Sequence, residues 1–188
     1  MSHTYMRTYH LIGFLLWFVC VVAALSHGQD EILKNPAVLA QVKDIHESGC
    51  SDVFLGTFGP LMTEYSFRIT ADGTPSKTES SHEFASNTMR VYNTDLAIVH
   101  SHPMAGDPRP SPGDITTATH IRRSNYEVSL YAIWVAEGNG TVRKVATLKS
   151  GKHGALIVTF LDGTVLTAVD STWYGPLKVY FNRKEYRA

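Results

Sequence analysis

The stretch Leu96-Ala97-Ile98-Val99-His100-Ser101-His102-Pro103 joins four apolar residues directly to a pair of histidines. A continuous apolar run is typical of a strand buried on both faces, as in the sheet of an α/β protein. Side chains at positions i and i+2 of a strand point to the same face, so both imidazoles can reach one metal ion. The stretch therefore predicts a buried strand that ends at a site-bearing loop.

A second polar stretch, Ser111-Pro112-Gly113-Asp114, follows a predicted loop at Met104–Pro110, which contains two prolines and a glycine. Helix capping can explain it, because serine is a favoured N-cap, proline suits the first helical turn and an early aspartate suits the helix dipole. The same helix N-terminus can also aim Asp114 at the histidines. Two histidines, an aspartate and a water would form the pattern of a catalytic zinc site.

The rest of the chain predicts one α/β domain with a mixed sheet flanked by helices. Asn35-Pro36 is typical of a helix start, and we expect that helix to end near Gly49. The polar segment Thr74–Ser86 indicates a flexible loop. Strands are predicted at 53–58, 64–70, 96–101, 127–136 and 141–148, and in a hairpin of 155–161 with 164–169.

Composition and the N-terminal segment indicate which partners and which cellular location to expect. The 188 residues have a formal net charge of +0 and no basic patch, which argues against nucleic acid as a partner. Leu11–Leu25 is an apolar run, short for a membrane span and typical of a signal-peptide core. We expect a signal peptide at 1–26 and an exported domain, periplasmic or secreted, at 30–188 with a C-terminal β-hairpin extension. The alternative is an uncleaved anchor, which would be the only contact with a membrane.

Taken together, His100-Ser101-His102-Pro103 and Ser111-Pro112-Gly113-Asp114 resemble the metal signature of the JAB/MPN (JAMM) metalloprotease superfamily. The resemblance covers roughly Val53 to Val145, and the motif is most similar to that of bacterial, often exported members with Pro-Ser-Pro before the aspartate. It implies an MPN/cytidine-deaminase-like fold. Seven residues separate Pro103 from Ser111, whereas the well-known eukaryotic members usually have six.

The resemblance also implies roles for individual residues. His100, His102 and Asp114 would ligate Zn²⁺, with water as the fourth ligand. A metal-bound water loses its proton near neutral pH, which makes it a nucleophile. Ser111 would hydrogen-bond the oxyanion of the tetrahedral intermediate.

A glutamate would act as the general base and pass the proton to the leaving amine. In the family this residue begins a strand upstream of the histidines. Glu64, which starts the alternating segment Glu64–Thr70, has that context and is our choice. Glu79 and Glu83 are alternatives, although the expected polar loop would position a base less rigidly than a strand.

The leading functional hypothesis is a zinc metallopeptidase or isopeptidase, a hydrolase with a protein or peptide substrate. One alternative is a non-catalytic JAB/MPN-like binding module in an exported protein. Another is a module that binds zinc or copper without catalysis.

Overall fold

The computed structural model describes residues 30–54, 63–84, 89–102, 107–169, 178–181 and 184–187. The chain divides into two units, Met1–Lys34 and Asn35–Ala188. In the first unit, the 3-10 helix η1 (Glu31–Lys34) contains an ion pair of 2.5 Å between its first and last side chains. The predicted signal peptide or anchor lies outside the described residues. No described helix has the length and apolar character needed to span a membrane.

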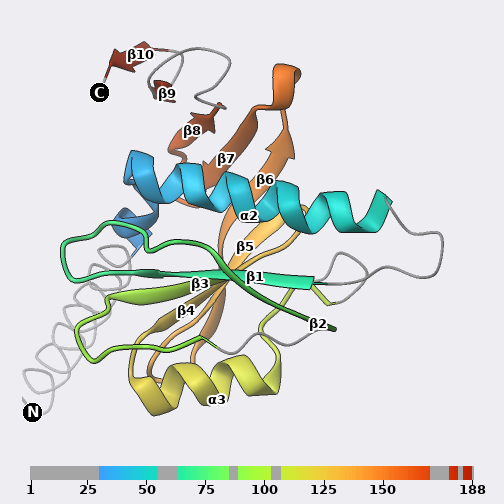
Figure 1. Ribbon diagram of the computed structural model, residues 1–188. Helices are drawn as coiled ribbons and strands as arrows, with labels where there is room; N and C mark the ends of the chain where they lie inside the picture. Colours follow the sequence, from blue (N-terminus) through green and yellow to red (C-terminus); the bar gives the residue numbers. More distant parts are fainter. Residues whose placement is uncertain are drawn as a thin grey trace, which may run out of the picture. The chain divides into compact units, whose positions relative to one another are not determined.

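The second unit is built on a mixed sheet with the strand order β10-β9-β8-β7-β6-β5-β4-β3-β1-β2 (Figure 1). Among the described strands, β3 and β4 form the only parallel pair. The predicted mixed α/β class is confirmed. The strands are β1 (Thr63–Ile69), β2 (Glu79–Phe84), β3 (Ala97–Ser101), β4 (Ser124–Val128), β5 (Ala132–Ala136), β6 (Val142–Ser150), β7 (Leu156–Phe160), β8 (Val165–Ala168), β9 (Lys178–Phe181) and β10 (Lys184–Arg187).

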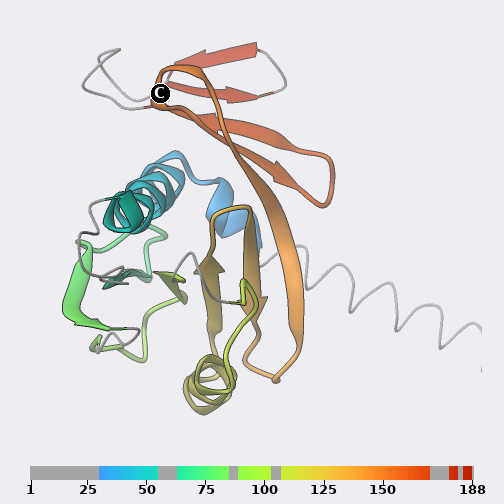
Figure 2. The ribbon, with the colours of Figure 1, turned by 90° about the vertical axis from the view of Figure 1, so that its right-hand side faces the viewer.

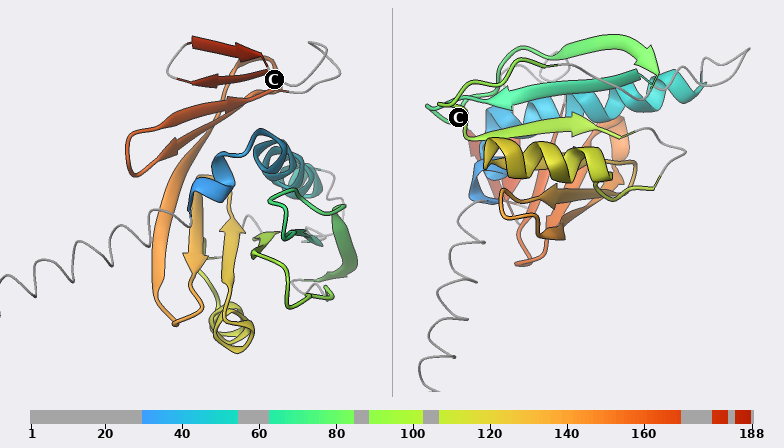
Figure 3. Two further views of the ribbon diagram at one scale, coloured as in Figure 1. Left: turned by 90° about the vertical axis from the view of Figure 1, so that its left-hand side faces the viewer. Right: turned by 90° about the horizontal axis from the view of Figure 1, so that it is seen from below.

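Two helices cover opposite faces of the strands that carry the histidines. Helix α2 (Pro36–Phe54) packs on one face of β1 and β3, and α3 (Pro112–Ile121) lies on the other side (Figures 1 and 3). Strand β3 is consequently buried at all five positions, which confirms the predicted strand with two buried faces. Helix α3 is also the crossover that a parallel pair such as β3 and β4 requires.

Helix α2 begins as predicted but ends later than expected. The Asn35 side chain accepts a hydrogen bond from the Ala37 amide at 2.9 Å, and Pro36 opens the helix. Gly49 was expected to end it, yet the helix runs on to Phe54. A helix-ending glycine needs a positive φ, and Gly49 is not among the glycines that have one. Packing against the sheet outweighs the cost of about 1 kcal/mol for a glycine inside a helix.

Two other predictions were wrong, because some turns and the edge strands of a sheet are hard to recognise in an amino-acid sequence. The predicted strand 127–136 is really β4 and β5, joined by a turn in which the Ser129 hydroxyl donates to the Ala132 carbonyl at 2.9 Å. The turn contains neither glycine nor proline. The predicted loop 74–86 contains β2, which pairs with β1 at the edge of the sheet. Edge strands are often polar, so β2 resembles a loop in sequence.

The predicted strands 64–70, 96–101 and 141–148 and the predicted hairpin agree with the structure, whereas the strand predicted at 53–58 does not where it is described. Strands β1, β3 and β6 lie within two residues of the expected ranges. The predicted hairpin is the β7–β8 pair, and Gly163 in its turn has a φ of 86°. Residues 53 and 54, expected to begin a strand, belong to α2, and 55–58 lie outside the described residues. Figure 2 shows the sheet bending so that the strands after β6 lie beside α2, which β8 contacts.

Asp95 fixes the segment that leads into β3. Its side chain is buried, and its two oxygens each accept a hydrogen bond of 3.2 Å from Arg68 Nη1 on β1. One oxygen also accepts from the Tyr92 amide at 2.7 Å. These contacts hold the start of β3 against its neighbour β1.

We expect Asp95→Ala to lower the free energy of unfolding by about 3 kcal/mol, because it leaves the largely buried guanidinium of Arg68 without its carboxylate. Urea denaturation monitored by circular dichroism would measure the loss. Arg109→Gln is the control, since it breaks an exposed ion pair with Asp107 and should leave the unfolding free energy nearly unchanged. Equal effects of the two substitutions would contradict this role for Asp95.

Candidate metal centre

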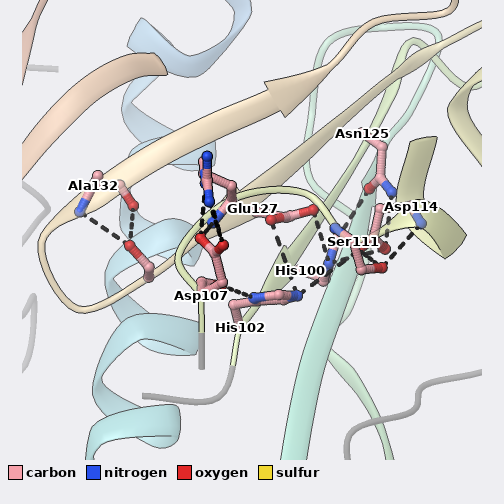
Figure 4. A network of polar contacts seen from close by, with 10 residues as sticks. His100, His102, Asp107, Ser111, Asp114, Asn125, Glu127 and Ala132 are labelled. Atoms are coloured by element: carbon pink, nitrogen blue, oxygen red, sulfur yellow. Dashed lines mark hydrogen bonds and ion pairs between the residues drawn. The ribbon is translucent and has the colours of Figure 1, made fainter. Parts of the chain in front are cut away.

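Four side chains from neighbouring elements point toward one another beside the first turn of α3 (Figure 4). His100 lies on β3, and His102 follows the end of that strand. Asp114 is in the first turn of α3, and Glu127 is on β4. Each offers one ligand atom, and these four atoms all lie within 4.8 Å of one another. The structure thus brings together the three predicted ligands and adds a fourth candidate.

The pairing of the strands explains this arrangement. In the parallel β3–β4 ladder His100 is opposite Glu127, and in the antiparallel β1–β3 ladder it is opposite Ser66. Because side chains alternate between faces, His100 and His102 share the face that looks toward α3. Ser101 belongs to the opposite face, where its hydroxyl accepts a hydrogen bond from the Tyr65 amide at 2.9 Å.

The distances in the cluster suit ligands around an ion better than hydrogen-bonded pairs. His100 Nε2 lies 3.4 Å from Asp114 Oδ1 and 3.9 Å from Glu127 Oε1. His102 Nε2 lies 3.8 Å from Asp114 Oδ2 and 4.0 Å from Glu127 Oε2. Hydrogen bonds from nitrogen to oxygen are usually about 2.7–3.2 Å long. Ligand atoms about 2.1 Å from a tetrahedral metal are themselves about 3.4 Å apart.

Several of these atoms are buried without a partner. Within the described residues, His100 Nε2 and both carboxylate oxygens of Glu127 have no hydrogen bond. Burying such groups unpaired is costly, and most buried polar atoms in proteins do have partners. A cation held between them would satisfy all three atoms at once, so the residues present fit a metal ion.

Neighbouring groups orient both imidazoles for this purpose. His102 Nδ1 is 2.9 Å from the Asp107 carbonyl oxygen, which can only accept, so Nδ1 carries the hydrogen. His100 Nδ1 is 3.1 Å from Asn125 Oδ1. Both rings therefore turn Nε2 into the cluster, as metal-ligating histidines do when the other nitrogen is hydrogen-bonded.

Ser111 and Asp114 form the predicted helix cap and are joined by one further hydrogen bond. The Ser111 hydroxyl accepts from the Asp114 amide at 3.2 Å, and the Asp114 carboxylate accepts from the Ser111 amide at 3.0 Å. This capping box confirms Ser111 as the N-cap of α3. The Ser111 hydroxyl also donates to Asp114 Oδ2. Capping and metal binding are thus compatible in one carboxylate, while the oxyanion role of Ser111 stays a prediction.

The charges of the cluster depend on its burial. Burial raises the pKa of Glu127 to about 9, although the charge of His102 opposes the shift. Burial lowers the pKa of His102, but its contacts with Asp114 and Glu127 outweigh this and raise the pKa to about 9. Burial also lowers the pKa of His100. For Asp114 the effect of burial is outweighed by His102, His100 and Ser111, which hold its pKa well below the usual range.

Glu64, the predicted general base, lies on β1 beside this cluster. It lines a cavity of about 120 Å³ together with His100, Asp114 and Asn125. Burial raises the pKa of Glu64, while His102 lowers it and Asp114 raises it, so Glu64 is within electrostatic reach of both. Glu79 is exposed on β2 and does not line this cavity. The side chain of Glu83 lies outside the described residues.

Glu127 was not predicted as a site residue. The sequence placed it at the start of a single strand 127–136, whereas it lies inside β4. Its position opposite His100 depends on the register of two strands separated by a helix. The available signal was a lone carboxylate in the otherwise apolar Tyr126–Val128, next to another polar residue, Asn125.

Comparison with known proteins found no matching family model, curated protein or solved structure.

Asn125→Ala should weaken metal binding by about 10- to 100-fold, because His100 loses the group that orients its ring. Competition with a chromophoric zinc chelator would measure the dissociation constant. Asn139→Ala, at the exposed turn between β5 and β6, is the matched control and should bind zinc normally. If both variants bind zinc like the wild type, Asn125 does not orient a ligand.

Metal binding should also release protons and strengthen with pH. Glu127 and His102 both have pKa values raised to about 9, so both hold protons at pH 7 in the metal-free protein. Ligands must lose these protons to bind a metal, so the affinity should rise from pH 6 to pH 8. Calorimetric zinc titrations in two buffers of different ionisation enthalpy would count the protons. Binding without proton release would contradict the proposed ligands.

Proposed function

We propose that the protein is a zinc-dependent hydrolase of peptide or isopeptide bonds, of the JAB/MPN type that its motif resembles. One observation carries the proposal: His100, His102, Asp114 and Glu127 could hold a metal ion beside a cavity that Glu64 also lines. A metal site next to a partly buried carboxylate and an open space has the parts that metal-assisted hydrolysis needs.

The metal and Glu64 have separate roles in this proposal. Zinc would supply a nucleophile from water near neutral pH and polarise the scissile carbonyl. Glu64 would take a proton from the attacking water and pass it to the leaving nitrogen. Burial supports this role, since it raises the pKa of Glu64 toward the range in which a carboxylate exchanges protons readily.

Ser111 lies beside the site at the start of α3, and we propose that its hydroxyl stabilises the developing oxyanion. In the structure the hydroxyl donates to Asp114, so this role requires it to turn toward the substrate. The predicted signal peptide would bring the enzyme to peptides or proteins outside the cytoplasm.

A second candidate function follows from Glu127. Closed sites with four protein ligands are usually structural, whereas catalytic zinc sites keep one position for water. The four donors of this cluster thus favour, as the alternative, a domain that binds a metal without catalysis.

Glu64→Gln should reduce hydrolysis by at least about 100-fold while zinc content stays unchanged, because it removes a proton acceptor and spares the ligands. Turnover of a quenched fluorescent peptide library and of a fluorogenic isopeptide-linked lysine probe would be compared with zinc content. His102→Ala should lose both zinc and activity.

Glu79→Gln is the matched control and should behave like the wild type. Full activity of Glu64→Gln would exclude Glu64 as the base and point to Glu83, or to Glu79 if Glu79→Gln loses activity. A zinc-loaded wild type that cleaves none of the probes would favour the non-catalytic alternative.

A further inference from the structure

We propose that Glu127 is the fourth protein ligand of the metal, and that it occupies the position that water would need. The inference rests on the metal binding in the proposed function, though not on hydrolysis. Glu127 is not part of the motif that His100, His102 and Asp114 share with the JAB/MPN superfamily. It would make this a site with two imidazole and two carboxylate ligands, closed in the resting protein.

Glu127 is an acidic residue buried inside the protein. Its side chain is 0% exposed, although it carries a carboxyl group in the middle of a strand. Its neighbours Tyr126 and Val128 point to the other face of the sheet, as alternation requires. Glu127 therefore shares the α3 face with Asn125, which contacts both His100 and Asp114. A buried carboxyl group in this place requires a compensating partner.

Other buried carboxylates of this protein have hydrogen-bond or ion-pair partners. Buried Asp95 accepts three hydrogen bonds, from Arg68 and the Tyr92 amide. The largely buried Glu137 pairs with Arg143 at 2.7 Å. Neither oxygen of Glu127 has such a partner among the described residues. The Nε2 atoms of the two imidazoles lie 3.9 and 4.0 Å from its oxygens. Glu127 is thus arranged differently from the structural carboxylates of this protein.

The positions of the two Glu127 oxygens suit a metal ion as their partner. One oxygen of Glu127 faces His100 and the other faces His102, each across a gap too long for a hydrogen bond. Asp114 is related to the same two imidazoles in the same way, at 3.4 and 3.8 Å. Two carboxylates therefore face the same two Nε2 atoms across similar gaps. One cation at the centre of this arrangement would contact all four side chains.

A fourth protein ligand would change the chemistry of the site. Four protein ligands fill a tetrahedral shell, so water can bind only if Glu127 moves away or the coordination number increases. Glu127 would then hold the metal tightly and keep its reactivity low until the carboxylate is displaced. This would combine the features of a closed and a catalytic site in one cluster.

The test compares wild type with Glu127→Gln and the control Glu137→Gln, which makes the same chemical change away from the cluster. Competition titration should show that Glu127→Gln binds zinc at least about tenfold more weakly, while the control binds normally. In the cobalt(II)-substituted wild type, azide should leave the visible absorption unchanged because no position is open. In Glu127→Gln, azide should shift the absorption by entering the vacated position.

Melting temperatures separate a ligand from a structural residue. Glu127→Gln should not lower the melting temperature of the metal-free protein, since it removes an unpaired acid, but it should reduce the increase caused by zinc. Glu137→Gln should lower the metal-free value, because the 2.7 Å ion pair between Glu137 and Arg143 loses its charge on one side, and keep the full increase with zinc.

The inference would be overturned if Glu127→Gln bound zinc as tightly as the wild type and its cobalt spectrum did not respond to azide. If that variant does not fold, azide addition to the cobalt(II)-substituted wild type is the test. A shift of the wild-type absorption would also overturn the inference. These outcomes are independent of hydrolysis. A protein that cleaves no probe, yet loses zinc affinity with Glu127→Gln, would refute the proposed enzyme and support the fourth ligand.

Discussion

The register between the parallel strands β3 and β4, which sets His100 opposite Glu127, is the constraint on which this structure depends. Both strands are buried at every position, so any polar side chain on them must find a partner inside the protein. A shift of one residue would turn either side chain to the opposite face of the sheet. The packing of α2 and α3 on the two faces makes such a shift costly. The core and the candidate metal centre are therefore specified by the same contacts.

Helix α3 connects these two strands and completes the cluster. Its capping box places the Asp114 carboxylate at the helix N-terminus, where backbone amides and the helix dipole favour a negative charge. One oxygen of Asp114 serves the cap, and the other lies 3.4 Å from His100 Nε2. The helix cap thus fixes the position of Asp114, a candidate metal ligand. The capping and metal-binding interpretations of Ser-Pro-Gly-Asp apply to the same atoms.

The errors of the sequence analysis have physical causes. Gly49 lies inside α2, because packing on the sheet is worth more than the local preference of glycine. Strand β2 is polar because it lies at the edge of the sheet. The turn after β4 is held by the Ser129 hydroxyl and lacks the usual turn residues. Because of that last error Glu127 was not predicted as a site residue. The expected strand 127–136 gave no reason to place Glu127 next to His100.

The sequence alone determined the buried strand, the pair of histidines on one of its faces and the capped helix that follows, because each depends on local chemistry or on alternation. It also placed Glu64 within one residue of the start of β1, although not at the cavity. Only the tertiary structure decided that Glu127 joins the cluster. Its position follows from the pairing of two strands separated by a helix, and such a pairing depends on the packing of the whole sheet and not on any short run of residues.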